Sequence, residues 1–489
     1  MKAPPAVAAA LLLLPGLPLL HLPSRLHAQD QADRLLRLHR TLAAIERDAI
    51  WPSFQPDSIP VLYLIPGRGT LLAGWGGELP QGFERLPGAR EHGWRPEAAR
   101  GAASTSVELD GRSAAQVVVD TAAPDATLLA LAVHEAFHAF SGQARRPGRR
   151  FGQGENSFLV ASYPVFDAGN ETGVALEGRI LAAALAARSD DEARSLAAQF
   201  LAVRSARQRA LPSDLATFES LAELNEGLAE YAGLRAVALL APRTGWTPDA
   251  ERMRADLLGR LNDLIGAPER SLRLRYYATG PGLALLLDRL AAKDWKQTLV
   301  DSNRTLQDQL AYSVGYYDAE RRIAAEARAR HDWRAVRDEA ARIVTSLLAL
   351  RRAQVDSVLA APGILLTIDA QAIGGGIGLC GIDPQNLLQA SQGVLLHTRW
   401  LRPCAGASLQ GEFNTRVVHD QDAGTLRAVI GAEHEVAITA GGQPIPLEDA
   451  AARVVTGLTI ASPGATLRSA RAEVTRDGRA IRVRLLPPA

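Results

Sequence analysis

The pattern of hydrophobic and polar positions changes character twice along the chain. Short apolar runs, separated by turn residues, occur at residues 59–75 and 104–120 and are typical of strands. From Val174 to about Ala360, apolar residues recur at every third and fourth position, which is the spacing of one helical face. Short alternating runs return from Ile364 to Ala489. The pattern therefore predicts an α+β protein with a small N-terminal β-sheet, a large α-helical part and a C-terminal β-rich domain.

The same pattern predicts individual elements. A helix is expected at residues 30–50, and two strands are expected on either side of the turn Pro66–Gly69. A hairpin is expected around Asp110-Gly111, because Asp-Gly between strand-like runs favours a tight turn. Further helices are predicted at residues 190–210, 213–241, 249–265, 282–292 and 319–359.

A helix is also predicted for Thr127–Phe140, whose sequence TLLALAVHEAFHAF contains the pattern H-E-x-x-H. Positions i and i+4 of a helix lie on one face, so His134 and His138 can bind a single metal ion. Glu135 stands one step round the helix, where it can reach a water on that metal. These three residues predict a zinc site with Glu135 as general base. The alternative is that they are ordinary core and helix residues without a metal.

A second helical stretch, Leu221–Gly233, carries Glu226 and Glu230 on one face among apolar residues. A buried carboxylate is costly unless it is paired or bound to a metal. We therefore expect Glu226 to be the third zinc ligand, with the fourth position left for water. Glu230, one turn later, could accept a hydrogen bond from the outer ring nitrogen of His134 or His138. The alternative is a surface helix with spare acidic residues.

The segment Asn225–Tyr231, NEGLAEY, resembles the N-E-G-[FL]-A-x-Y signature of the gluzincin metallopeptidases, best known in the M1 aminopeptidases. This resemblance implies that Glu226 is the third zinc ligand. Tyr277–Gly280 is similar to the Y-x-x-G segment of that family, which implies that Tyr277 donates a hydrogen bond to the oxyanion of the transition state. Related peptidases also imply that the strand at residues 114–119 binds an extended substrate by strand addition.

The chain departs from the M1 enzymes in two ways. The interval from His138 to Glu226 is far longer than theirs, and the G-x-M-x-N motif for the substrate amine is absent. The aminopeptidase specificity is therefore not supported, and the resemblance is to a divergent gluzincin.

The N-terminus has the features of a secretory signal peptide. Lys2 precedes the apolar run Ala6–Leu20, and Leu26-His27-Ala28 offers a small residue for cleavage. The alternative is an uncleaved anchor, although Pro15 and Pro18 interrupt the run. We expect a signal peptide at residues 1–28, a catalytic domain at 29–360 and the β-rich domain at 361–489. The mature protein would then be secreted or periplasmic, with no segment that spans a membrane.

The two cysteines of the chain, Cys380 and Cys404, both lie in the predicted β-rich domain. In an exported protein this arrangement favours a disulfide. The alternative is a pair of reduced, buried thiols.

Composition limits the classes of function. The chain has 489 residues, of which 47% are hydrophobic and 22% charged, as in ordinary globular proteins. Its net charge of +1 provides no field that favours nucleic acid or anionic membrane. The expected partner, a peptide or protein substrate, follows from the predicted peptidase site. Three functions remain: a zinc peptidase, a zinc hydrolase of another substrate class on the same fold, and a non-catalytic zinc-binding protein. The third is disfavoured because Glu135 and Tyr277 serve chemistry and are dispensable for folding, and the sequence does not separate the second from the first.

Overall fold

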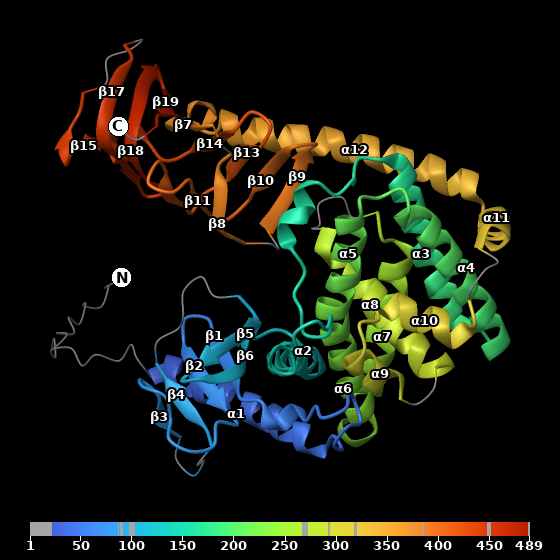
Figure 1. The fold of residues 1–489 in the computed structure, drawn as a ribbon. Helices are drawn as coiled ribbons and strands as arrows, with labels where there is room; N and C mark the ends of the chain where they lie inside the picture. The colour runs from blue at the N-terminus through green and yellow to red at the C-terminus, as the bar shows by residue number, and fades with distance from the viewer. Residues whose placement is uncertain are drawn as a thin grey trace, which may run out of the picture. The chain divides into compact units, whose positions relative to one another are not determined.

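The computed structural model describes residues 22–86, 88, 91–96, 103–266, 272–291, 294–316, 320–374, 376–383, 386–446 and 451–487. The fold mixes a small N-terminal sheet, a helical middle and a C-terminal β-rich part, as the sequence predicts (Figure 1). The chain divides into two compact units. The first comprises Met1–Phe140 and Ala236–Trp246, and the second comprises Ser141–Arg235 and Thr247–Ala489.

The first unit contains helix α1 (Leu22–Thr41), most of helix α2 (Asp125–Gln143) and a six-stranded sheet in the order β3-β4-β2-β1-β6-β5. Its strands are β1 (Val61–Ile65), β2 (Gly69–Ala73), β3 (Glu84–Arg85), β4 (Gly93–Arg95), β5 (Thr105–Leu109) and β6 (Arg112–Val118). The predicted hairpin is confirmed: β5 and β6 pair antiparallel around Asp110 and Gly111. Both turn residues have positive φ, 45° and 72°, as a two-residue hairpin turn of this kind requires.

The strand that was expected to bind substrate lies inside the sheet. β6 pairs with β1 on one side and with β5 on the other, so its hydrogen-bonding edges are occupied by the chain itself. Strand addition needs an exposed sheet edge. The expectation that residues 114–119 bind an extended substrate in this way is therefore wrong.

The first helix also differs from its prediction. α1 starts at Leu22 and ends at Thr41, where the Thr41 hydroxyl donates to the Leu38 carbonyl over 2.6 Å. A 3-10 turn, Leu42–Ala44, follows. The apolar periodicity continues past the helix because the loop buries its own apolar side chains, among them that of Ile45. The apolar run of the predicted signal peptide lies outside the described residues, which begin within the 1–28 segment.

Nine helices of the second unit follow each other between residues 168 and 330, counted over the described residues and including the start of α6. They are α3 (Ala168–Ala186), α4 (Asp190–Gln208), α5 (Ser213–Ala222), α6 (Leu228–Thr244), α7 (Thr247–Asn262), α8 (Tyr276–Leu290), α9 (Trp295–Asp301), α10 (Leu306–Val314) and α11 (Glu320–Arg330). A tenth, α12 (Trp333–Ala360), leads into the β-rich part. The single helix predicted at 319–359 is thus two, because Asp332 adopts a left-handed φ of 48° and caps α12 by accepting from the Ala335 amide.

The β-rich part forms one extended sheet system with the path β16-β15-β17-β18-β19-β7-β14-β13-β10-β9, to which β12, β11 and β8 attach through β18. Its strands are β7 (Leu365–Asp369), β8 (Gly378–Ile382), β9 (Leu387–Ser391), β10 (Val394–His397), β11 (Leu401–Cys404), β12 (Gln410–Phe413), β13 (Val417–Asp420), β14 (Thr425–Val429), β15 (Ala437–Ala440), β16 (Gln443–Pro444), β17 (Arg453–Ser462), β18 (Ala465–Asp477) and β19 (Ala480–Leu485). Val358 of α12 packs against this sheet through Ala390, Leu396 and Val418.

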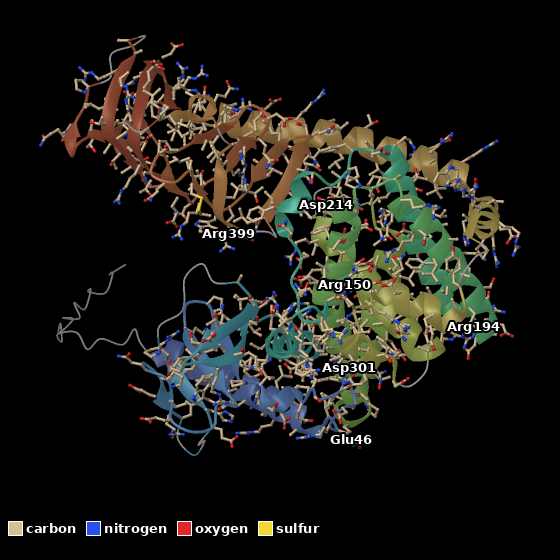
Figure 2. All side chains as sticks on the ribbon, viewed as in Figure 1. Glu46, Arg150, Arg194, Asp214, Asp301 and Arg399 are labelled. Atoms are coloured by element: carbon tan, nitrogen blue, oxygen red, sulfur yellow. A yellow bond between two sulfur atoms is a disulfide. The ribbon has the colours of Figure 1, made fainter. Side chains whose placement is uncertain are left out.

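The expected disulfide is present in the structure. Cys380 of β8 and Cys404 of β11 are bonded, with their Cα atoms 5.8 Å apart, and the bond is drawn in yellow in Figure 2. It joins two strands that also pair with each other. Among the described residues, no helix combines the length and apolar composition needed to cross a membrane.

Candidate metal centre

Helix α2 presents His134 and His138 on one face, as the H-E-x-x-H pattern predicts. Their Nε2 atoms lie 3.1 Å apart, and their ring centroids are separated by 4.8 Å. His134 and the neighbouring Glu135 are both 5% exposed. The helix is anchored by Phe137, which makes edge-on contacts with Trp51 and Phe54 at centroid distances of 5.6 and 5.2 Å. Aromatic packing thus fixes the rotation of α2 about its axis and the direction of both imidazoles.

Glu226 lies in a π-helical turn, Glu223–Gly227, which separates α5 from α6. Such turns insert a residue into a helix and occur frequently at functional sites. The turn is held by Glu223, whose two carboxylate oxygens accept from Nη1 and Nη2 of Arg204 at 3.0 and 2.8 Å. Both side chains are 3% exposed, so this ion pair is buried inside the helical part and holds the turn in place. The π turn thus changes the helical phase in the segment that carries Glu226.

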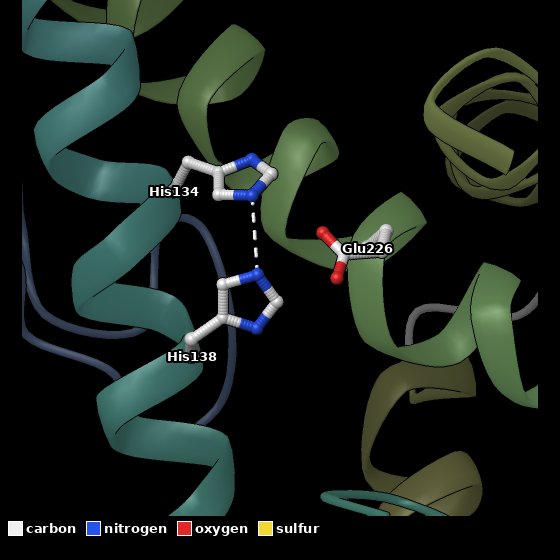
Figure 3. Close-up of side chains that lie close together, drawn as sticks. All are labelled: His134, His138 and Glu226. Atoms are coloured by element: carbon white, nitrogen blue, oxygen red, sulfur yellow. Dashed lines mark hydrogen bonds between the residues drawn. The ribbon is translucent and has the colours of Figure 1, made fainter. Parts of the chain in front are cut away.

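His134, His138 and Glu226 form a group that could hold a metal ion (Figure 3). One ligand atom from each lies within 4.8 Å of those of the other two. A tetrahedral zinc with bonds of about 2.0–2.1 Å places its ligand atoms about 3.3 Å from each other. The 3.1 Å between the two Nε2 atoms matches this spacing. Two imidazole nitrogens and one carboxylate oxygen are also a donor set that zinc prefers.

A second set of side chains surrounds Glu226, and two of its members, Glu155 and Arg273, were not predicted from the sequence. Arg273 donates to Glu226 Oε1 through Nη2 and to Glu155 Oε1 through Nε, the latter over 2.7 Å. Asn225 donates through Nδ2 to Glu155 Oε2 at 2.8 Å and to Glu226 Oε1 at 3.4 Å. We call these four residues the Glu226 ring. A carboxylate that is bonded by two neighbours in this way has a fixed orientation, as metal-binding carboxylates commonly do.

The charge of the ring favours a cation. The ring combines two carboxylates, Glu155 and Glu226, with one guanidinium, that of Arg273. Burial opposes the charge of Arg273, but Glu226 and then Glu155 outweigh it and raise the pKa of the guanidinium above its usual value. Arg273 therefore stays charged, and one net negative charge remains beside the predicted ligand oxygen. A dication bound there would find an environment of opposite sign.

Two adjacent tyrosines at the start of α8 have different surroundings. Tyr276 is 4% exposed and packs edge-on against Phe218 at 5.6 Å. Its hydroxyl has no hydrogen-bond partner within the described part of the chain, and burial raises its pKa well above the usual value. Tyr277 is less buried, and it follows Arg273, which bonds to Glu226, by four residues along the chain. The two tyrosines therefore differ in exposure, and Tyr277 is the more accessible.

Glu230 has a partner other than the one expected. It accepts a hydrogen bond from Nη2 of Arg260 on α7 over 2.9 Å. Its side chain is 26% exposed, against 7% for Glu226. The hydrogen bond that Glu230 was expected to accept from His134 or His138 stays a prediction.

The residues that the sequence did not reveal, Glu155 and Arg273, have little local pattern. Glu155 stands in the loop before Asn156, and Arg273 stands in the short 3-10 turn Leu272–Arg275. The one available signal was position: Arg273 precedes Tyr277 by one helical turn.

No protein-family model, no curated protein and no solved structure matches this chain.

Proposed function

We propose that this chain is an exported zinc-dependent peptidase of the gluzincin type. One observation carries the proposal: His134 and His138 on α2 and Glu226 on a distant segment of the chain bring one ligand atom each within 4.8 Å of the others. Two imidazole nitrogens and one carboxylate oxygen are a donor set that zinc prefers, and the 3.1 Å between the two Nε2 atoms fits tetrahedral coordination. The Cys380–Cys404 disulfide is compatible with an oxidising compartment, and with the predicted signal peptide it supports a secreted or periplasmic location.

Zinc held by these three residues would polarise the scissile carbonyl and lower the pKa of a water molecule. The chain itself supplies the other functions. Glu135, next to His134 on α2, would accept the proton of the attacking water and return it to the leaving amine. Tyr277 would donate a hydrogen bond to the oxyanion that develops on the carbonyl. Arg273 and Asn225 would hold Glu226 in its liganding orientation.

Metal analysis and peptide hydrolysis test the proposal together. Purified protein should contain about one zinc per chain, and it should cleave casein or a quenched peptide in a reaction that a chelator abolishes. His138→Ala should lose the zinc. Full zinc content in His138→Ala would show that the assignment of the zinc ligands is wrong. Bound zinc without hydrolysis of any peptide would favour another substrate class or a non-catalytic role.

Glu135→Gln separates catalysis from metal binding. The amide cannot accept a proton from water, so this variant should keep its zinc and its fold and lose nearly all hydrolysis. Glu108→Gln, on the exposed strand β5, is a control for the loss of one carboxylate. Substantial turnover by Glu135→Gln at normal zinc content would exclude Glu135 as the general base.

A further inference from the structure

A cluster of buried charges adjoins the π turn that carries Glu226. Its members are two arginines of α4 and three glutamates from neighbouring helical segments: Arg204, Arg207, Glu177, Glu219 and Glu223. Their side chains are between 2% and 6% exposed, so charges of both signs are removed from water together. We call these five residues the α4 cluster.

Each glutamate of the α4 cluster accepts hydrogen bonds from an arginine of α4. Glu219 accepts from Nη1 and Nη2 of Arg207 at 2.7 and 3.0 Å, in the same way as Glu223 accepts from Arg204. Glu177 of α3 accepts from both arginines, from Nε of Arg204 at 2.9 Å and from Nη2 of Arg207 at 3.1 Å. Burial opposes the charge of Arg204, but Glu223 and then Glu177 outweigh it and raise the pKa of the guanidinium above its usual value. Arg204 therefore stays charged and remains bonded to Glu223.

Stability alone is a poor explanation for the α4 cluster. Removing charged groups from water costs free energy that ion pairs recover only in part, so apolar side chains of similar volume are often as stabilising. A buried ion pair favours one arrangement of its partners, however, because other arrangements leave a charge without a counter-ion. The α4 cluster thereby fixes which residues of α5 and of the π turn face α4.

The π turn that carries Glu226 is held at both ends. Its first residue, Glu223, is bonded to Arg204. Its last residue, Gly227, lies against the backbone of Gly280 with no room for a side chain. Conversion of the turn into ordinary α-helix would shift the register between α5 and α6 by one residue, which is a rotation of about 100°. Such a shift would break one of the two contacts and turn Glu226 away from its present direction.

We infer that Glu223 is a positioning residue for the predicted zinc site. Its ion pair with Arg204 keeps the π turn in register, and the turn directs Glu226 toward the two histidines. The inference rests on the proposed function as far as the metal is concerned, but it does not depend on peptide hydrolysis. Neither the H-E-x-x-H pattern nor the N-E-G motif includes Glu223, so its role is additional to those of the residues that resemble the gluzincins.

Glu223→Gln tests this inference, and Glu177→Gln is its matched control. The amide nitrogen of glutamine cannot accept a hydrogen bond, so Glu223→Gln keeps only one of the two bonds from Arg204. Glu177→Gln removes the same charge from the same arginine at similar burial, but on α3, outside the segment that carries Glu226. Both variants should unfold at a lower urea concentration than the parent. Only Glu223→Gln should lose zinc affinity, by about ten-fold or more in a competition titration with a chromogenic chelator.

Cobalt(II) in place of zinc reports the arrangement of the ligands, which a loss of overall stability does not alter. The visible absorption bands of the cobalt protein should change in Glu223→Gln and stay as in the parent in Glu177→Gln. Glu223→Asp keeps the charge with a shorter reach, so it should retain part of the zinc affinity. This variant replaces Glu223→Gln in the comparison if the latter does not fold.

Equal zinc affinities and equal cobalt spectra in the two glutamine variants would overturn the inference, because the α4 cluster would then act on stability alone. Zinc binding without peptide hydrolysis would refute the peptidase and leave this comparison valid. Hydrogen exchange of the metal-free protein provides a test without any metal: the amides of residues 223–227 should exchange faster in Glu223→Gln than in Glu177→Gln. If the parent binds no zinc, equal exchange of these amides in the two variants would overturn the inference as well.

Discussion

Gly227 and Gly280 lie against each other with no side chain between them. A Cβ atom at Gly227 would stand 2.5 Å from the Cα atom of Gly280, a distance that real Cβ contacts do not reach. These are the glycines of the two motifs, N-E-G and Y-x-x-G, that carry the resemblance to gluzincins. The motifs are therefore joined by a backbone contact between the π turn and α8, which brings the segment of Tyr277 up to the segment of Glu226.

Gly227→Ala should accordingly separate the two segments. The added methyl group meets backbone, which cannot move as a flexible side chain would, so we expect a loss of about 1–3 kcal/mol in unfolding free energy. Urea unfolding measures this change. Zinc content should fall in parallel, because the backbone that the methyl group displaces carries Glu226, the residue directly before Gly227.

Gly259→Ala is the matched control for this substitution. Gly259 also lies within a helix, but a Cβ atom there meets nothing within 4 Å. Alanine is the better helix former, so this variant should be as stable as the parent or more stable by up to about 1 kcal/mol. Equal stability of both variants would show that the backbone around Gly227 and Gly280 can move to accommodate a methyl group without loss of stability.

Tyr277, rather than Tyr276, is expected to be the oxyanion donor. Loss of one such donor typically lowers turnover by about 10²–10³-fold, so Tyr277→Phe should lower kcat by this amount with little change in KM. Tyr276→Phe should keep normal turnover. It should also be at least as stable as the parent, because it removes a buried hydroxyl that has no partner among the described residues. If Tyr276→Phe lowered turnover and Tyr277→Phe did not, the motif would begin one residue earlier. If both variants kept normal turnover, another residue would be the oxyanion donor.

Arg273 is expected to set the zinc affinity through Glu226. Loss of a group that orients a metal ligand typically costs about 10–100-fold in affinity, so Arg273→Gln should weaken zinc binding by this factor in a competition titration with a chromogenic chelator. Arg273→Lys should restore part of the affinity. Lysine keeps the positive charge, but it lacks the planar guanidinium that bonds to both Glu226 and Glu155.

Arg260→Gln serves as the control for Arg273. Arg260 also pairs with a glutamate of the same helical segment, but with Glu230 instead of Glu226. Its replacement should leave zinc affinity unchanged. If both variants bound zinc as tightly as the parent, the Glu226 ring would have no influence on the metal.

Periodicity and turn chemistry were sufficient to predict most elements, and the failures have physical causes. The H-E-x-x-H helix and the hairpin at Asp110-Gly111 depend on local sequence, and both were predicted. The break at Asp332 was missed because a single left-handed residue leaves the apolar period intact. Glu155 was missed because its bond to Arg273 joins residues 118 positions apart, and a lone glutamate in a loop has no pattern. Likewise, the register of β6 between two neighbours is a tertiary feature that its own residues do not encode.

Two buried histidines of the β-rich part should make its stability depend on pH. His397 and His419, on β10 and β13, are 1% and 2% exposed, and their rings stack with centroids 6.0 Å apart. Burial, and the neighbouring His419, lower the pKa of His397 to about 3. Burial also lowers the pKa of His419 to about 4, although Asp420 opposes the shift. Both imidazoles are therefore neutral in the folded protein across the neutral and mildly acidic range.

The sign of the effect follows from proton uptake. Below pH 6.5 the unfolded chain binds protons at both histidines and the folded chain does not, so the stability of this part is complete above pH 6.5 and falls as the pH drops toward 4. One pKa unit corresponds to about 1.4 kcal/mol, so the loss between pH 6.5 and 5 should be on the order of 2–4 kcal/mol. Hydrogen exchange of the amides of β10 and β13 at pH 7 and pH 5 measures this loss locally. Replacement of both histidines by leucine should remove most of the difference, whereas His434→Leu, at an exposed position, should not. Protection of β10 and β13 that changes equally with pH in the parent and in the doubly substituted protein would show that other groups control the acid response.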